Sequence, residues 1–111
     1  MLGLDANMRV YVRTGFTDGR LGFEGLRGIA LKVVKLNPRN GHLFVFCNAR
    51  ATRVKLLWYH EGGFYIASKR MDRGTIDWPK SDKGAAQMNT RQLEALLRGA
   101  EFTRQNGGVP R

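Results

Sequence analysis

Positively charged side chains are concentrated between two stretches that have the composition of β-strands. Lys69, Arg70 and Arg73 lie between segments rich in aromatic and β-branched residues, which are typical of a pleated, half-buried surface. Arginine and lysine at the rim of a sheet can bind phosphate groups and stabilise the negative charge on them. The formal net charge of +10 and the isoelectric point near 10.7 also favour a polyanionic partner.

More cations belong to the neighbouring strand of a predicted hairpin. The segments 53–59 and 64–70 have strand patterns and flank a Glu-Gly-Gly turn signal. With a two-residue loop, Arg53 and Lys55 share one face of the sheet with Arg70. Like charges on neighbouring strands are mildly destabilising, which indicates a bound anion that relieves the repulsion. Alternatively, these long side chains reach solvent from a face that a helix covers. The two interpretations stay open until the covered face of the sheet is known.

Other kinds of active site have little support in the sequence. His42, His60 and Cys47 occupy separate strand positions without the spacing of a zinc site. Ser68 and Ser81 lack the context of an activated nucleophile. We therefore expect no metal, no cofactor and no catalysis. One enzymatic alternative is a metal-independent ribonuclease of the bacterial toxin type, in which Arg and Lys on a small sheet stabilise the charge on a scissile phosphate.

The elements that must hold these cations follow from the periodicity of apolar residues. Alternation in 8–13 predicts an edge strand, and apolar spacing in 23–34 predicts a helix that Thr17 or Asp18 caps and Asn37-Pro38 ends. Its glycines, at every third residue, predict a bare face lying close to the sheet. The remaining predicted elements are strands at 42–47, 53–59, 64–70 and 75–78, a loop at 80–86, and a helix capped by Asn89 or Thr90.

These elements predict the α+β class, with a strand, a helix, a four-stranded antiparallel meander and a C-terminal helix packed on the sheet. We expect a single domain over residues 1–102 and a flexible basic tail over 103–111. No apolar run approaches the length of a membrane span, so no membrane partner and a reducing cytoplasm are expected. Exposed edges at the first strand or at 75–78 would permit a homodimer by sheet extension.

One set of residues, spread from about Val10 to Phe102, matches a known family pattern. The matching residues are Thr17-Asp18 with Arg20, Gly22, Gly25-Leu26, the turn 38–41, the GHLFVF segment 41–46, Arg53 with Lys55 and Leu57, Gly63, Lys69-Arg70, Gly74 and Trp78-Pro79. In these residues the chain resembles the TnpB-type accessory proteins of bacterial insertion sequences of the sixty-six class, the product of the second open reading frame, unrelated to the RNA-guided nuclease of the same name. The chain departs from the family at three places: the family usually has Met at Gly19, a basic residue at Cys47 and an Asp-Gly-rich turn at 59–63.

The resemblance implies a role in transposition beside a separate, larger transposase that carries the acidic catalytic residues. We therefore expect a non-catalytic accessory factor that binds DNA or the transposase–DNA complex through a basic sheet surface. A protein adaptor for the transposase without DNA contact, and the toxin-type ribonuclease, are the alternatives. The candidate nucleic-acid-binding residues are Arg20, Arg53, Lys55, Lys69, Arg70 and Arg73.

Overall fold

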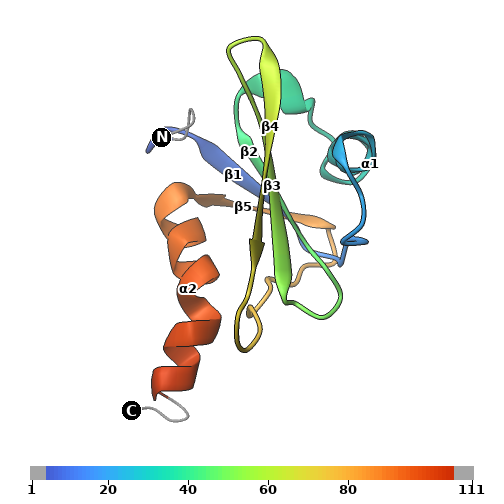
Figure 1. Cartoon of the computed structure of the whole chain (residues 1–111). Coiled ribbons are helices and arrows are strands. Elements are labelled where there is room, and N and C mark those ends of the chain that lie inside the picture. The colour runs from blue at the N-terminus through green and yellow to red at the C-terminus, as the bar shows by residue number, and fades with distance from the viewer. Residues whose placement is uncertain (1–4, 107–111) are drawn as a thin grey trace.

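The computed structural model describes residues 5–106, with side chains described for residues 5–98. It is a five-stranded mixed sheet with helical segments packed on its two faces, which confirms the predicted α+β class (Figure 1). In chain order the elements are β1 (Arg9–Arg13), α1 (Phe23–Ile29), the π-helical turn η1 (Ala30–Val34), the 3-10 turn η2 (Pro38–Asn40), β2 (Leu43–Cys47), β3 (Arg53–His60), β4 (Gly63–Arg70), β5 (Ala85–Asn89) and α2 (Thr90–Asn106).

The strand order differs from the predicted meander. The order is β4-β3-β2-β1-β5, and β1 runs parallel to β2 while every other neighbouring pair is antiparallel. The prediction that β1 is an edge strand is wrong, because β5 pairs with it along all five residues. Val10 and Val12 are fully buried accordingly. β5 was missed as a strand because its sequence, AAQMN, has low β-propensity.

The segment between β4 and β5 is irregular, and the predicted strand at 75–78 does not form. Its two large apolar side chains, Ile76 and Trp78, are nevertheless buried against the sheet. The Ile76 amide donates to the carbonyl of Ala51 (2.8 Å), and the Trp78 indole Nε1 donates to the carbonyl of Arg13 (2.8 Å). The alternating apolar residues that predicted a strand are therefore two buried side chains that hold a loop against the sheet.

The first helical region is shorter than predicted and is capped differently. α1 begins at Phe23 with Gly22 as its N-cap, and η1 ends before Lys35, which adopts a left-handed conformation (φ 66°). The close-packing role predicted for the glycines is wrong at Gly22 and Gly28. Among the described residues, a Cβ built at either position meets no atom within 4 Å.

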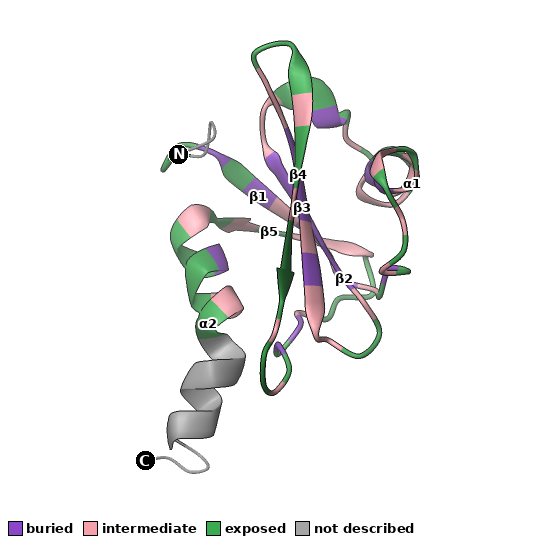
Figure 2. Cartoon of the chain, in the orientation of Figure 1, coloured by how far each residue is buried: buried purple, intermediate pink, exposed green. Residues whose placement is uncertain are grey.

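Each face of the sheet carries a buried core, and α1 and α2 lie on opposite sides (Figure 2). Leu26 and Ala30 pack on Phe44, Phe46 and Leu57 on the first face. The second face is covered by α2 and by the irregular segment before β5. Its core consists of Met8, Val10, Val12, Leu43, Val45, Cys47, Val54, Leu56, Trp58, Ile76, Trp78 and Leu93.

The capping box predicted for the C-terminal helix is confirmed. Asn89 Oδ1 accepts from the Gln92 amide (2.8 Å), and Gln92 Oε1 accepts from the Asn89 amide (2.8 Å). α2 continues to Asn106, four residues into the segment predicted to be a tail. Residues 107–111 lie outside the described residues, so the flexible tail stays a prediction.

Candidate nucleic-acid interface

The register of the β3–β4 hairpin brings two arginines side by side. Arg53 lies directly opposite Arg70, and Lys55 lies opposite Ser68, which confirms the predicted sharing of one sheet face. This is the face on which α1 packs. Arg70 is exposed and Arg53 is half-buried. Within residues 5–98, no carboxylate oxygen lies within 4.0 Å of a guanidinium nitrogen of Arg53 or Arg70. We call Arg53, Lys55 and Arg70 the basic cluster.

Asn48 fixes the backbone at the start of β3. Its Oδ1 accepts from the amides of Thr52 and Arg53, both at 3.0 Å, and its Nδ2 donates to Thr52 Oγ1 (3.1 Å). Its own amide donates to the carbonyl of Arg53 (3.1 Å), and the turn places Ala51 in a left-handed conformation (φ 57°). The sequence predicted a polar turn at 48–52 but gave Asn48 no role in the candidate site.

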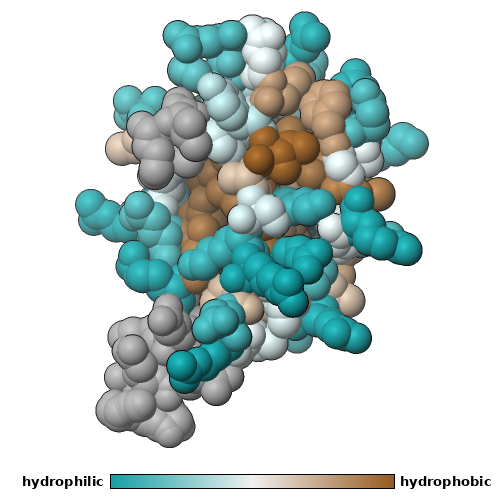
Figure 3. Space-filling view, in the orientation of Figure 1, coloured by the Kyte–Doolittle hydropathy of each residue, from teal (hydrophilic) through white to brown (hydrophobic). Residues whose placement is uncertain are grey.

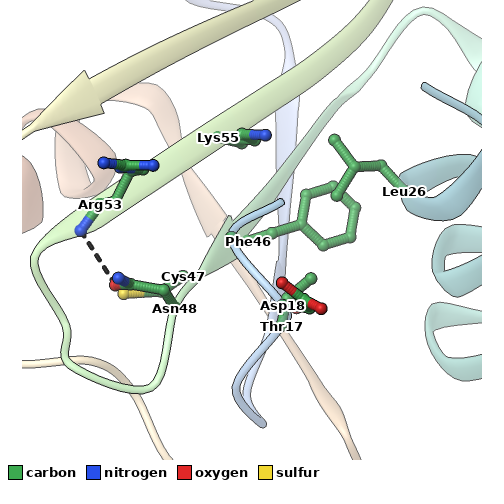
Figure 4. A pocket seen from close by; sticks show the side chains of 9 residues that line it. Thr17, Asp18, Leu26, Phe46, Cys47, Asn48, Arg53 and Lys55 are labelled. Atoms are coloured by element: carbon green, nitrogen blue, oxygen red, sulfur yellow. Dashed lines mark hydrogen bonds between the residues drawn. The ribbon is translucent and has the colours of Figure 1, made fainter. Parts of the chain in front are cut away.

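Lys55 joins the sheet to the loop that precedes α1. Its Nζ donates to the carbonyl of Leu21 (2.7 Å), and the side chain is half-buried. An ammonium has three donors, so this bond leaves donor capacity for an anion. Figure 4 shows Lys55 and Arg53 on β3, with Phe46 of β2 and Asp18 of the loop beside them. The loop before α1 therefore covers this face as far as Lys55 and leaves Arg70 open to solvent.

Arg20 lies on the same loop but is paired with a carboxylate. Its Nε and Nη2 donate to the two oxygens of Asp18 (3.0 and 2.8 Å), and its amide donates to Asp18 Oδ1 (2.9 Å). These bonds, and weaker attraction to Arg20 and Lys55, lower the pKa of Asp18 to about 2 from 3.8. Asp18 was predicted to cap the helix; it closes the turn before Leu21 instead.

We expect the Asp18 carboxyl to titrate near pH 2 in carbon-detected NMR. Because the folded-state pKa is depressed, the pairing stabilises the fold above the ordinary pKa of 3.8, and this contribution is lost as the pH falls through about 2. Arg20→Gln should move the midpoint back toward 3.8, whereas Lys83→Gln, a substitution in the loop before β5, should leave it in place. A wild-type midpoint at 3.8 would contradict the paired geometry.

Two of the predicted cations lie elsewhere. Lys69 is opposite Val54, so it faces the other side of the sheet from Arg70, and its Nζ donates to the carbonyl of Leu97 in α2 (3.2 Å). Arg73 is exposed on the irregular segment after β4. The structure thus brings together Arg53, Lys55 and Arg70, with Arg20 on the adjoining loop, and separates Lys69 from them.

A small cavity lies beside the basic cluster, with Arg53 and Lys55 in its wall. Its volume is about 10 Å³, enough for one water molecule and too small for an organic substrate. Thr17 is buried in its wall, and its hydroxyl has no hydrogen-bond partner among the described residues. Burial raises the pKa of the neighbouring Cys47 thiol to about 11, which opposes a nucleophilic role. The lining residues are Thr17, Asp18, Gly19, Leu26, Phe46, Cys47, Asn48, Arg53 and Lys55.

The two histidines are remote from the basic cluster. His60 ends β3 beside the hairpin turn, where its Nε2 lies 3.4 Å from Glu61, and seven residues of strand place it about 23 Å from Arg53. His42 Nδ1 accepts from the amide of Arg9 (3.0 Å). In the described part of the chain, no group of three or more His, Cys, Asp or Glu residues is placed to hold a metal ion. No helix in that part combines the length and apolar character needed to cross a membrane.

Comparisons with known proteins give the family. A family model described as "IS66 Orf2 like protein" matches residues 8–107. Two proteins of Sinorhizobium fredii (strain NBRC 101917 / NGR234) are similar: the uncharacterized protein y4hO is 39% identical over 92% of this chain and 89% of its own length, and the uncharacterized protein y4jC is 27% identical over 94% and 89%. No solved structure matches. The chain therefore belongs to the family of IS66 Orf2-like proteins, which are generally not catalytic, and this membership implies an accessory role in IS66 transposition.

Proposed function

We propose that this protein assists transposition by binding DNA, alone or within the transposase–DNA complex, through the basic cluster. The observation that carries the proposal is the direct opposition of Arg53 and Arg70 on neighbouring strands. No ion pair to a described carboxylate relieves their repulsion. A phosphate between or beside the two guanidinium groups would turn this unfavourable pair into two charge-assisted contacts.

The residues around Arg53 and Arg70 are also suited to binding phosphate. Lys55 lies two residues along β3 on the same face, so its ammonium can contact a neighbouring phosphate. Arg20 lies on the adjoining loop, and its side chain is 90% exposed despite the bond to Asp18. Ser68, opposite Lys55, adds an exposed hydroxyl to this surface. Three cations and a partly neutralised fourth can thus follow a nucleic-acid backbone.

The proposed contacts address the backbone and not the bases. Arg and Lys side chains on a sheet face fix a protein on phosphates, whereas sequence is read by groups placed in a groove. α1 has seven residues, and its buried side chain Leu26 packs on the sheet, so it does not present a recognition helix. We therefore expect little base preference, with the target site chosen by the transposase.

The test is the salt dependence of DNA binding. Three or four phosphate contacts predict that log affinity falls against log salt with a slope of about −3 to −4 for duplex DNA. Arg53→Gln and Arg70→Gln should each reduce this slope by about one, and Lys69→Gln, on the opposite face, should not. A slope near zero, or equal effects of all three variants, would overturn the proposed interface.

The alternatives give different results in the same preparation. A pure adaptor would retain the transposase in a pull-down after nuclease treatment and would show no salt-dependent DNA binding. A toxin-type ribonuclease would cleave RNA without metal and lose cleavage in Arg70→Ala. His42 and His60 both lie outside the basic cluster, so cleavage there would depend on charge stabilisation by Arg and Lys alone, and we expect none.

A further inference from the structure

β4 is a long edge strand. It has eight residues, against about five or six in an average strand, and it contains no proline. It pairs with β3 along its whole length, and within the described residues no strand pairs with its outer side. Figure 2 shows it mostly in the colour of exposed residues. Such an edge is a template for a further strand unless something prevents pairing.

The side chains of β4 are distributed unevenly along the strand. Tyr65 and Ile66, in its middle, are 40% and 41% exposed, which is high for large apolar side chains. Figure 3 shows an apolar area on this side of the molecule with hydrophilic side chains around it. The cations Lys69 and Arg70 are confined to the C-terminal end, while the other end is Gly63, next to the turn that carries Glu61. Because the charges of β4 are confined to one end, the centre of the strand is free to pair with another strand.

The distribution of charged and apolar side chains along β4 is self-complementary when two copies of the strand run antiparallel. Two copies related by a two-fold axis perpendicular to the sheet keep each face continuous. Residues opposite each other must then come from the same face, so a residue at the centre lies opposite its own copy. Centring on Ile66 places Ile66 against Ile66 and Tyr65 against Ala67, while Lys69 lies opposite Gly63 of the other copy. A parallel arrangement would instead put the two cationic ends side by side.

We propose that a second copy of this chain pairs with β4 in an antiparallel ladder centred on Ile66. The ladder joins residues 63–69 of both copies and closes the exposed edges of both sheets. Each Arg70 lies beside Gly62 and near Glu61 of the other copy, where no cation opposes it. Centring on Ala67 gives a ladder of equal length but leaves Ile66 opposite Ser68, so it buries less apolar surface.

The dimer gives the molecule two basic clusters on one continuous sheet face. Each Arg70 is four residues from the centre, so the two lie about 26 Å apart along the strands. Two clusters on one rigid sheet engage a single duplex bivalently, which raises avidity without new contacts. The dimer itself does not depend on nucleic-acid binding, so it can be tested without DNA.

The first test is the mass of the full chain in solution by analytical ultracentrifugation. We expect twice the 12.5 kDa of one chain. Ile66→Lys and Ile66→Glu should each raise the dimer dissociation constant by about 100-fold, because like charges then meet at the centre. Mixing the two variants should restore a dimer, which also shows that both fold. The matched control is Leu31→Lys, at a side chain with 39% exposure on η1, and it should leave the mass unchanged.

Engineered disulfides test the register. Directly opposite residues have Cα atoms about 4.5–5.5 Å apart, within the range for a disulfide. Ile66→Cys should therefore give a covalent dimer under mild oxidation. Ser68→Cys, exposed on the same face but about 13 Å from its copy, should not. A monomeric wild type at high concentration, or a dimer that Ile66→Lys leaves intact, would overturn the proposal. Equal crosslinking of both variants would overturn the register.

Discussion

Trp78→Ala is expected to lower the free energy of unfolding by about 3–5 kcal/mol, the range for large aromatic side chains removed from a core. The side chain is 5% exposed and packs in the core on the face that α2 covers. Its indole also donates to the carbonyl of Arg13 (2.8 Å), which connects the irregular segment before β5 to the C-terminal end of β1. The loss is a large fraction of the stability of a domain of this size.

A conservative variant separates packing from hydrogen bonding at this position. Trp78→Phe keeps most of the apolar surface but leaves the Arg13 carbonyl without its partner, so we expect a loss of about 1–3 kcal/mol. Phe16→Ala, at a side chain that is 51% exposed, is the control and should change stability by less than about 0.5 kcal/mol. Urea denaturation followed by circular dichroism measures all three. A Trp78→Ala protein as stable as the control would show that this segment is not an anchor.

The strands that could be predicted are those in which local pattern and tertiary role agree. β2 is apolar at every position and buried at every position, and the β3–β4 hairpin has the register that its turn predicted. Two segments were misassigned for opposite reasons. The segment 75–78 alternates like a strand because Ile76 and Trp78 both point into the core from a loop. β5 contains weak strand formers and is held in the sheet by its pairing with β1.

The helix preceding β2 shows the limit of spacing arguments. Its apolar periodicity correctly gives the buried face at Leu26 and Ala30. Glycine has no side chain to bury, so apolar periodicity cannot tell a glycine on the exposed side of a helix from a glycine at a close contact. The open space around Gly28 decides between these two roles, and only coordinates show it.

The part of the candidate site that could be predicted is the part that depends on the alternation of side chains between the two faces of a strand. This alternation places Arg53, Lys55 and Arg70 on one face once the hairpin loop is known. The same rule sends Lys69 to the opposite face, although the sequence presents Lys69 and Arg70 as one cluster. The bonds from Lys55 to Leu21 and from Arg20 to Asp18 depend on where the loop before α1 lies against the sheet. The local sequence does not indicate where this loop lies in the tertiary structure.

The double variant Arg53→Glu/Arg70→Glu is expected to weaken binding to duplex DNA by about 100-fold at low salt. It removes the two proposed phosphate contacts and puts two carboxylates in their place, so attraction becomes repulsion. Fluorescence anisotropy at fixed low salt measures the loss. Lys32→Glu/Arg91→Glu has the same effect on net charge at exposed positions outside the basic cluster, and it should change the affinity far less. Similar losses in both proteins would mean that overall charge, not the cluster, holds the DNA.

The single variant Arg70→Glu distinguishes a binding role from a structural one. It places a carboxylate directly opposite Arg53, so a like-charge pair becomes an opposite-charge pair across the strands. We expect the fold to gain about 0.2–1 kcal/mol while DNA binding weakens, because the two effects come from the same change in charge. If the arginine pair served the fold, the variant would lose stability. A gain in stability would show that the facing arginines cost the fold free energy, a cost that a negatively charged partner between or beside them would offset.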